Sequence, residues 1–294
     1  MVLQGKTISL ISRILMGTVI CGVLVSCSGS DEKQSKKQKI TGDRIPVLTF
    51  EQNLTEDPEL ANLQVQLPKP YTNSNWSQAG GNAHHVMQHP SLGDNPTKIW
   101  SVNIGEASNN RRSIVSMPVV ENGVLYAMDA MSKVTAYNAD TGNKIWQKEF
   151  KQKGETENIS YGGGIAIGPD ALYITNGYGH IAALSKSTGE EIWLSRLSVP
   201  MRGAPTYSEG RLFALTHDNQ TYALDAKDGR TLWNEVGISE NAGLVGAASP
   251  AVIGNTVISA YSSGELYAMR VENGRVLWSD TLNTQGRLTA MSTL

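Results

Sequence analysis

Between residues 113 and 283, short stretches of alternating hydrophobic and polar residues are separated by turn signals rich in glycine, asparagine and aspartate. Such alternation is typical of β-strands with one buried face, and turns at about ten-residue intervals indicate antiparallel pairing. Residues 203–236 show the pattern most clearly, with predicted strands at 204–207, 211–215, 220–225 and 230–235. No window has the period of a capped amphipathic helix, so the pattern predicts an all-β fold.

One eleven-residue phrase recurs four times in this region. It reads AYNADTGNKIW at 136–146, ALSKSTGEEIW at 183–193, ALDAKDGRTLW at 223–233 and AMRVENGRVLW at 268–278. Its glycine and tryptophan keep a fixed register, at Gly142 and Trp146, Gly189 and Trp193, Gly229 and Trp233, and Gly274 and Trp278. With Trp100 in front, the tryptophans are spaced by 46, 47, 40 and 45 residues. A repeat of this length, built from four strands, is typical of a β-propeller blade.

We therefore predict a β-propeller of four-stranded antiparallel blades. About four complete blades fit between about residues 113 and 283, after a partial leading unit at about 76–102. The tryptophan is expected to pack between neighbouring blades, and the glycine to open the turn that lets it do so. A β-sandwich does not repeat its sequence at this period, and a helical solenoid would need the helical period that is missing.

The N-terminal residues resemble an export signal. Lys6 and Arg13 form a basic start, residues 14–25 are apolar, and Leu-Val-Ser-Cys at 24–27 resembles the lipobox of bacterial lipoproteins. We predict a signal peptide at 1–26, cut before Cys27, which would carry the lipid, palmitate included. The alternative is an uncleaved anchor helix, although Arg13 interrupts the apolar run that a spanning helix needs. Residues 27–75 are predicted to be the lipidated cysteine followed by a flexible tether and entry segment.

Charge and cysteine content exclude several kinds of site. A net charge of −2 and a pI of about 6.2 provide no basic field for nucleic acid. The chain has two cysteines, and Cys21 lies inside the predicted signal peptide. The mature chain would keep only Cys27, so it would have no disulfide, no cysteine metal site and no thiol nucleophile.

The repeated phrase resembles the repeat of the pyrroloquinoline-quinone (PQQ) propeller superfamily. The order of lipobox, polar tether, the entry sequence WSQAGGN at 76–82 and tryptophan-marked blades resembles the BamB family of outer-membrane assembly lipoproteins. Residues 161–164 and 246–250 are similar to its alphaproteobacterial form. The resemblance covers about residues 76–294. Because the family's ring has eight blades, it implies that 76–294 is a partial propeller domain, an open arc truncated on its C-terminal side.

The same resemblance implies a non-catalytic scaffold, anchored through Cys27 to the periplasmic face of the outer membrane. Ser28 after the cysteine indicates the outer membrane under the lipoprotein sorting rule. The implied partners are the periplasmic domains of the barrel-assembly subunit BamA, other subunits of that machinery and unfolded outer-membrane proteins. Val199, Met201 and Arg202 occupy the place of the family's partner-binding element. The acidic pair that accompanies this element in the family is missing from residues 243–247.

The alternative is a membrane-tethered PQQ-dependent dehydrogenase or a PQQ-binding sensor. Those enzymes resemble one another in a vicinal cysteine disulfide against the cofactor, which the mature chain cannot form. We therefore expect no catalytic residue, no cofactor and no metal. His84 and His89 could share a metal, but no further ligand pattern accompanies them. His180 and His217 are predicted to lie at the surface. The acids of the hairpin turns are predicted to be solvated: Asp140, Glu190, Asp228 and Glu272.

Overall fold

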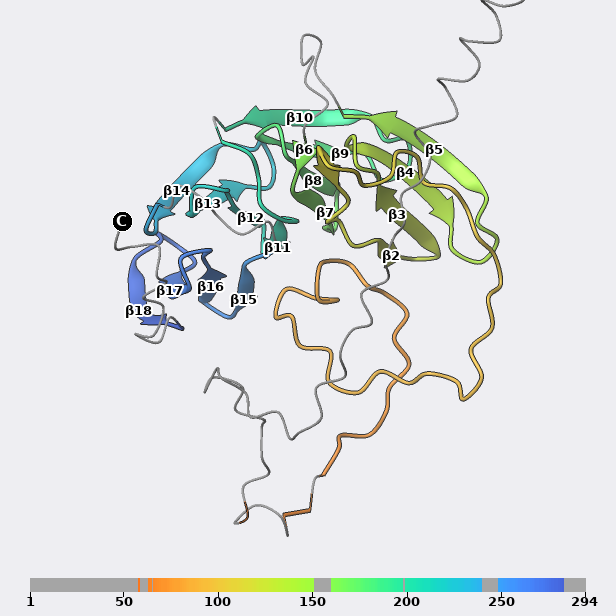
Figure 1. The fold of residues 1–294 in the computed structure, drawn as a ribbon, viewed down its shortest axis with the longest axis horizontal. Helices are drawn as coiled ribbons and strands as arrows, with labels where there is room; N and C mark the ends of the chain where they lie inside the picture. Colours follow the sequence, from red (N-terminus) through yellow and green to blue (C-terminus); the bar gives the residue numbers. More distant parts are fainter. Residues whose placement is uncertain are drawn as a thin grey trace, which may run out of the picture. The chain divides into compact units, whose positions relative to one another are not determined.

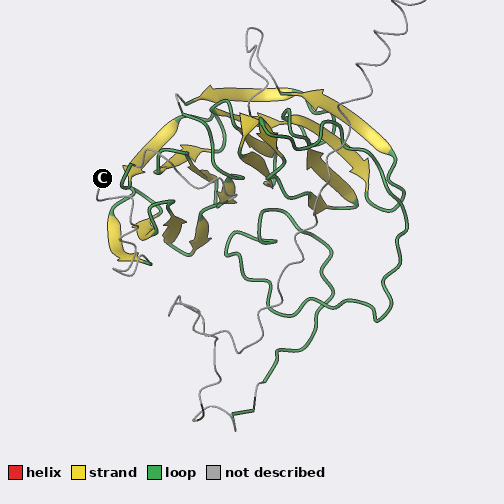
Figure 2. Cartoon of the chain, viewed as in Figure 1, coloured by secondary structure: helices red, strands yellow, loops and turns green. Residues whose placement is uncertain are grey.

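The computed structural model describes residues 58, 63–64, 66–150, 160–197, 199–239 and 248–282. The chain divides into two compact units, Met1–Gln64 and Val65–Leu294, and nearly all described residues belong to the second. In the described part of the chain there is no helix, and hence none that could cross a membrane (Figure 2). The predicted signal peptide, Cys27 and residues 243–247 lie outside the described residues.

The second unit contains four sheets of four antiparallel strands, and in each sheet consecutive strands pair. Blade 1 comprises β2 (Val119–Glu121), β3 (Val124–Met128), β4 (Lys133–Asn138) and β5 (Lys144–Glu149). Blade 2 comprises β7 (Gly163–Ile167), β8 (Leu172–Asn176), β9 (His180–Leu184) and β10 (Glu191–Arg196). Blade 3 comprises β11 (Thr206–Ser208), β12 (Arg211–Leu215), β13 (Gln220–Asp225) and β14 (Thr231–Val236). Blade 4 comprises β15 (Ala251–Ile253), β16 (Thr256–Ala260), β17 (Glu265–Arg270) and β18 (Val276–Thr281).

The blades follow one another along an open arc, with β2, β7, β11 and β15 on its inner side and β5, β10, β14 and β18 on its outer side (Figure 1). A short parallel pair, β1 (Arg112–Ser113) and β6 (Ser160–Tyr161), lies outside the blades. This arrangement confirms the predicted class, a propeller built from four-stranded antiparallel blades.

Blade 3 shows how closely the alternation of residues predicts the strands. Its second and third strands have the predicted bounds, while the first starts at Thr206 rather than at residue 204. Pro205 lacks the N–H that a ladder hydrogen bond needs, which accounts for the later start. The hairpin glycine Gly229 has φ 74°, and Gly274 in blade 4 has φ 73°. This left-handed conformation is the one predicted for the turn glycines.

The repeated tryptophan and glycine meet between neighbouring blades. The indole of one unit packs on the turn glycine of the next, in the pairs Trp100 and Gly142, Trp146 and Gly189, Trp193 and Gly229, and Trp233 and Gly274. A Cβ added to Gly229 would lie 2.5 Å from Cε3 of Trp193, so a side chain there would displace the ring. Each of these indoles also donates its Nε1 hydrogen bond to a carbonyl three residues before the glycine, at 2.9–3.0 Å. We call each such contact between neighbouring units a junction.

The hydrophobic core is distributed over these junctions rather than gathered in one place. One cluster joins blades 1 and 2, a second joins blades 2 and 3, and a third joins blades 3 and 4. Each sheet of the arc therefore buries its faces against its neighbours, as expected for a repeat protein stabilised by nearest-neighbour contacts.

The segment predicted as a partial leading unit takes another form. Between residues 76 and 102, all of them described, the backbone makes isolated bridges and no strand. Residues 76–83 run along the inner strands of all four blades. Their contacts, in order, are Trp76 with Val120, Ser77 with Ile167, Gln78 with Tyr207, and Ala83 with Val252. The segment is held by pairing with these four separate sheets, so it has no neighbouring strand with which to build a sheet of its own.

Candidate functional site

The predicted partner-binding element lies between β10 and β11. Val199 is half-buried and Pro200 is exposed, whereas Met201 is fully buried and Arg202 is 5% exposed. Met201 forms a backbone bridge with Thr216 and packs in the core cluster between blades 2 and 3. The structure therefore brings the three residues together but turns two of them into the protein.

Arg202 reaches toward the turn between β12 and β13. Its Nη1 donates a hydrogen bond to Oδ1 of Asn219 at 3.3 Å, and its backbone N–H donates to the carbonyl of Leu215 at 2.7 Å. Oδ1 of Asn219 also accepts hydrogen bonds from the backbone and hydroxyl groups of Ser262, in blade 4. The guanidinium thus takes part in a buried polar network that connects blades 3 and 4.

The other residues singled out in the sequence have clear places. The repeat glycines and tryptophans form the junctions, except that Trp278 is 49% exposed. The side chains of His84 and His89 each contact a carbonyl, through Nδ1 to Val252 at 2.7 Å and to Pro68 at 2.8 Å respectively. The hairpin acids Asp140, Glu190, Asp228 and Glu272 are exposed, as predicted.

His180 corrects a prediction, because it is 1% exposed rather than at the surface. It begins β9, where its ring packs edge-on against Phe150 and accepts a hydrogen bond from Nε of Arg196 at 3.0 Å. The turn that precedes it faces the neighbouring blade, so a residue at a turn is covered there by the end of blade 1. His217, at the matching turn of blade 3, is half-buried.

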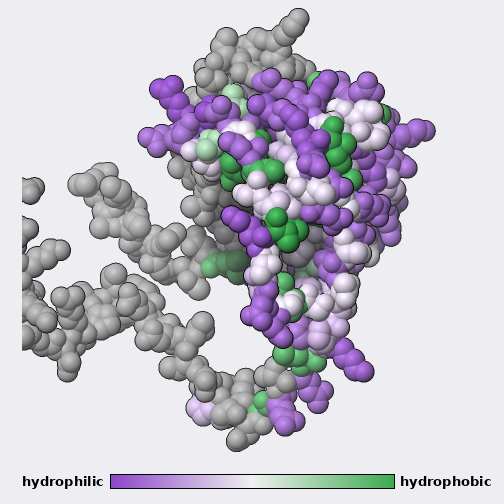
Figure 3. Space-filling view, turned by 90° about the vertical axis from the view of Figure 1, so that its right-hand side faces the viewer, coloured by the Kyte–Doolittle hydropathy of each residue, from purple (hydrophilic) through white to green (hydrophobic). Residues whose placement is uncertain are grey.

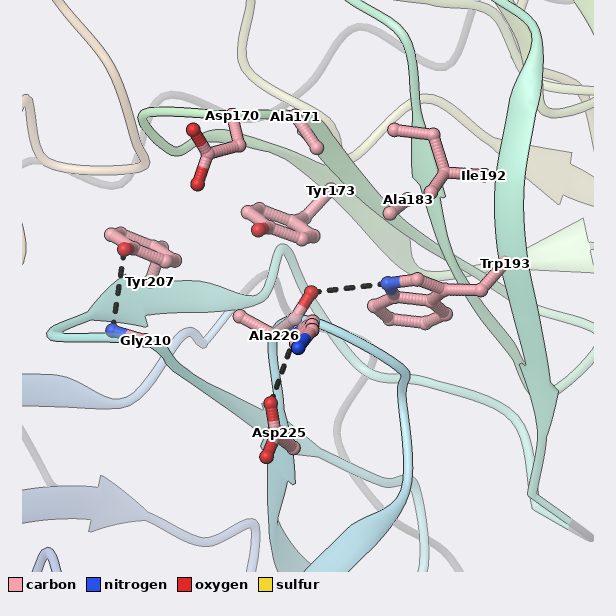
Figure 4. A pocket seen from close by; sticks show the side chains of 11 residues that line it. Asp170, Ala171, Tyr173, Ala183, Ile192, Trp193, Tyr207, Gly210, Asp225 and Ala226 are labelled. Carbon is pink, nitrogen blue, oxygen red and sulfur yellow. Dashed lines mark hydrogen bonds between the residues drawn. The ribbon is translucent and has the colours of Figure 1, made fainter.

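A pocket of about 390 Å³ lies at the junction of blades 2 and 3. It is lined by Asp170, Ala171, Tyr173, Ala183, Ile192, Trp193, Tyr207, Gly210, Asp225, Ala226 and Lys227. The rings of Tyr173 and Tyr207 stack with centroids 5.5 Å apart and planes within 4° (Figure 4). Trp193 closes one side through its hydrogen bond to the carbonyl of Ala226. We call this space the junction pocket.

The junction pocket is lined by charged groups of both signs, from the carboxylates of Asp170 and Asp225 and the side chain of Lys227. Burial, together with the charges of Tyr207, Asp170 and Asp225, raises the pKa of Tyr173 to about 12, so its hydroxyl stays neutral. A hydrogen bond from the backbone N–H of Lys227 and the nearby Arg230 guanidinium lower the pKa of Asp225.

Sequence reasoning did not single out this pocket. Six of its lining residues lie in two copies of the repeated phrase, but at different positions of it: Ala183, Ile192, Trp193, Asp225, Ala226 and Lys227. One signal was available at the residue three positions before the repeat glycine, whose carbonyl accepts the indole hydrogen bond. That residue is Ala139, Lys186, Ala226 or Val271 in successive units, so its size and charge vary while the phrase around it is kept.

On the face shown in Figure 3, hydrophobic side chains form small separate patches among hydrophilic ones. Such scattered residues are normal for a protein surface. This face therefore does not itself indicate a large apolar interface.

Comparisons with known proteins agree with the fold. The chain is 24% identical over 192 residues to the outer membrane protein assembly factor BamB of Yersinia pestis, covering 64% of this chain and 49% of the relative. The crystal structure of BamB from Moraxella catarrhalis matches with a TM-score of 0.51 and 20% identity, over 61% of this chain and 53% of that one. Quinohemoprotein alcohol dehydrogenase from Comamonas testosteroni matches with a TM-score of 0.54 and 17% identity, over 71% and 41%. These two structural likenesses show the fold alone.

The family comparison is more specific. The chain spans about half the length of the curated relatives it matches. The model of the family described as outer membrane protein assembly factor BamB matches residues 130–294, which is more than half of the chain and includes blades 2 to 4. The match, the tryptophan-marked blades and their glycine turns agree with one another, and the chain belongs to the BamB family.

Proposed function

We propose that the protein is a non-catalytic scaffold lipoprotein of the outer-membrane β-barrel assembly machinery. It docks on the periplasmic domains of BamA, with other subunits or unfolded outer-membrane proteins as further partners, and assists the insertion of barrel proteins. The family match over residues 130–294 carries this proposal. The fold supports it, because blades locked together at their junctions present loops on a rigid frame, which suits protein docking.

The proposed docking element comprises Val199, Met201 and Arg202. Because Met201 and Arg202 are buried in this chain, the part open to a partner is the half-buried Val199 with the exposed Pro200. Arg202 supports the element from within through Asn219. The proposal is therefore that Val199 makes the apolar contact, while Met201 and Arg202 hold the loop in the conformation that the partner binds.

Co-purification with BamA tests the docking element. Val199→Glu should strongly reduce co-purification while leaving the unfolding transition close to that of the unchanged protein, since it places a charge at a partly exposed position. Arg202→Glu should reduce co-purification and also lower stability, because it buries an acid next to Asn219. Ile253→Glu is the matched control, since Ile253 is 60% exposed on β15 of blade 4 and the proposed element lies between blades 2 and 3. Full co-purification of Val199→Glu would remove the element from the interface.

The lipid anchor is a separate part of the proposal. Cys27→Ser should move the protein from the outer-membrane fraction to the soluble periplasmic fraction, because the acyl chains supply the membrane affinity. Metabolic labelling with palmitate gives an independent readout. Continued membrane association of the unlabelled variant would favour the uncleaved anchor helix instead.

The alternative is a membrane-tethered PQQ-dependent dehydrogenase or PQQ-binding sensor, and its support is the fold shared with the quinohemoprotein alcohol dehydrogenase. Adding PQQ and calcium to the purified protein separates the two proposals. The scaffold proposal expects neither saturable binding nor reduction of an electron-accepting dye. Saturable binding with dye reduction would overturn it.

A further inference from the structure

The junction of blades 1 and 2 and the junction of blades 2 and 3 differ in one side chain beside the buried indole. At the junction of blades 1 and 2, the residue three positions before the repeat glycine is Lys186, whose carbonyl receives the Trp146 indole at 2.9 Å. At the junction of blades 2 and 3, the equivalent residue is Ala226, which receives Trp193 at 3.0 Å. The two places have the same backbone geometry, but one has a long cationic side chain and the other has a methyl group.

At the first of these junctions the space is occupied by an ammonium group. Nζ of Lys186 donates hydrogen bonds to Oε2 of Glu121 at 2.9 Å and to the carbonyl of Gly168 at 3.0 Å. The lysine and glutamate side chains are 27% and 23% exposed, so the pair lies largely inside the junction. The molecule itself thus shows that a lysine fits between two neighbouring blades at this position.

At the second junction, smaller residues stand in the places of Lys186 and Glu121: Ala226 and Gly168. Gly168 in blade 2 is the counterpart of Glu121 in blade 1. Tyr126 pairs with Val119 and Tyr173 pairs with Ala166, and Glu121 and Gly168 each lie two residues after that partner. A Cβ on Gly168 would lie 2.6 Å from Cε2 of Tyr173, so the stack of Tyr173 on Tyr207 requires a glycine. With Ala226 in place of lysine, the space that remains is the junction pocket.

Two acids and one cation line the junction pocket, Asp170, Asp225 and Lys227, and Asp170 is exposed. Asp225 forms an ion pair with Arg230 at 3.2 Å and accepts a hydrogen bond from the backbone N–H of Lys227. Asp170, by contrast, makes no hydrogen bond or ion pair with any residue that the structure describes, and its carboxylate lies next to the tyrosine pair (Figure 4). Tyrosine and tryptophan rings stabilise a nearby cation through their negative faces and pack well against a methylene chain.

We propose that the junction pocket binds a lysine side chain of a partner polypeptide, with its ammonium group at Asp170 and its methylene stem against Tyr173 and Trp193. The bound lysine enters the junction beside Ala226, the counterpart of Lys186, but its ammonium group meets Asp170, whereas that of Lys186 meets Glu121. This site is separate from the element at Val199 and goes beyond the proposed docking on BamA.

The first test uses n-butylammonium as the probe for a lysine side chain. In a titration followed by NMR, n-butylammonium should shift the ring signals of Tyr173 and Tyr207 in a saturable manner, whereas n-butanol at equal concentration should not. Asp170→Asn should weaken the binding about three- to five-fold, as expected for loss of a partly exposed charge contact. Equal binding of n-butanol, tighter binding of n-butylguanidinium or no saturable shift would overturn the proposal.

The second test lets the chain fill its own pocket. Ala226→Lys should abolish n-butylammonium binding and raise the melting temperature, and this rise should disappear when Asp170→Asn is added. Ala226→Met is the matched control, because it adds similar bulk without charge, and its melting temperature should not respond to Asp170→Asn. Conversely, Lys186→Ala should create a second n-butylammonium site, at Glu121. Unchanged binding in Ala226→Lys, or no added site in Lys186→Ala, would contradict the proposal.

Discussion

Trp193 and Trp278 end the same eleven-residue phrase, yet their surroundings differ. Each sits on the outer strand of its blade opposite an alanine, Ala183 in one case and Ala268 in the other. Trp193 is half-buried on the turn of Gly229 with its indole N–H bonded to Ala226. Trp278 is 49% exposed and meets no turn glycine among the described residues. The blade alone therefore places the indole, and the neighbouring blade buries it.

This difference locates the stability of the fold. An indole that covers little apolar area and leaves its N–H in water contributes little, whereas one packed in a junction contributes both burial and a hydrogen bond. Stability should then follow the number of closed junctions rather than the number of blades.

The largest difference is expected between the two tryptophans themselves. Trp193→Ala should lower the free energy of unfolding by about 3 kcal/mol, because it opens a cavity in a junction and removes a hydrogen bond. Trp278→Ala should cost less than about 1 kcal/mol, since that side chain is already half in water. Urea denaturation of the two variants measures both values. Equal losses would show that the indole acts within its own blade.

The turn glycine gives a second comparison. Gly229→Ala should cost about 2 kcal/mol or more, because φ is 74° and the added Cβ would be forced against Trp193. Gly210→Ala is the matched control, with φ 78° but no atom within 4 Å of the added Cβ, so it should cost only about 1 kcal/mol. Similar losses in both variants would mean that backbone conformation alone, and not packing on the indole, requires the glycine.

The entry segment offers a third kind of contact. Gln78 donates to the carbonyl of Tyr207 at 3.0 Å and accepts from its backbone N–H at 2.8 Å, so its amide acts as a missing strand neighbour for β11. Gln78→Ala should cost about 1 kcal/mol and increase hydrogen exchange at the Tyr207 amide. Gln147→Ala removes a part-buried hydrogen bond to the hydroxyl of Thr135 within blade 1, so it should leave hydrogen exchange at the Tyr207 amide unchanged.

The smallest effect is expected for the ion pair at the first junction. Lys186→Met should keep the methylene packing and lose the contact with Glu121, at a cost of about 0.5 kcal/mol that shrinks as salt is added. Arg230→Met removes a more exposed pair with Asp225 and should cost less. If Lys186→Met lowered the free energy of unfolding by more than Gln78→Ala does, Lys186 would be one of the principal contacts of its junction.

Features set by neighbouring residues could be predicted from the sequence. Strand alternation, the turn at Gly229 and the register of Trp193 depend on a few adjacent positions, and these were confirmed. The placement of His180 was wrong because the turn before β9 is covered by Phe150 from the preceding blade. The burial of Arg202 could not be predicted from the sequence either, because its hydrogen-bond partner Asn219 also binds Ser262 of blade 4.

By itself, the sequence determined the blade: its four strands, its hairpin glycines and the spacing of its tryptophans, because alternation and turn chemistry act over a few residues and repeat with each copy. The tertiary structure alone decided what each copy meets. It buried His180 and Arg202, ran residues 76–83 along four inner strands, and left a pocket where Ala226 faces Asp170. The physical reason is that a junction is formed by two blades whose contacting residues lie about one repeat or more apart, so neither copy of the phrase contains the information about its neighbour.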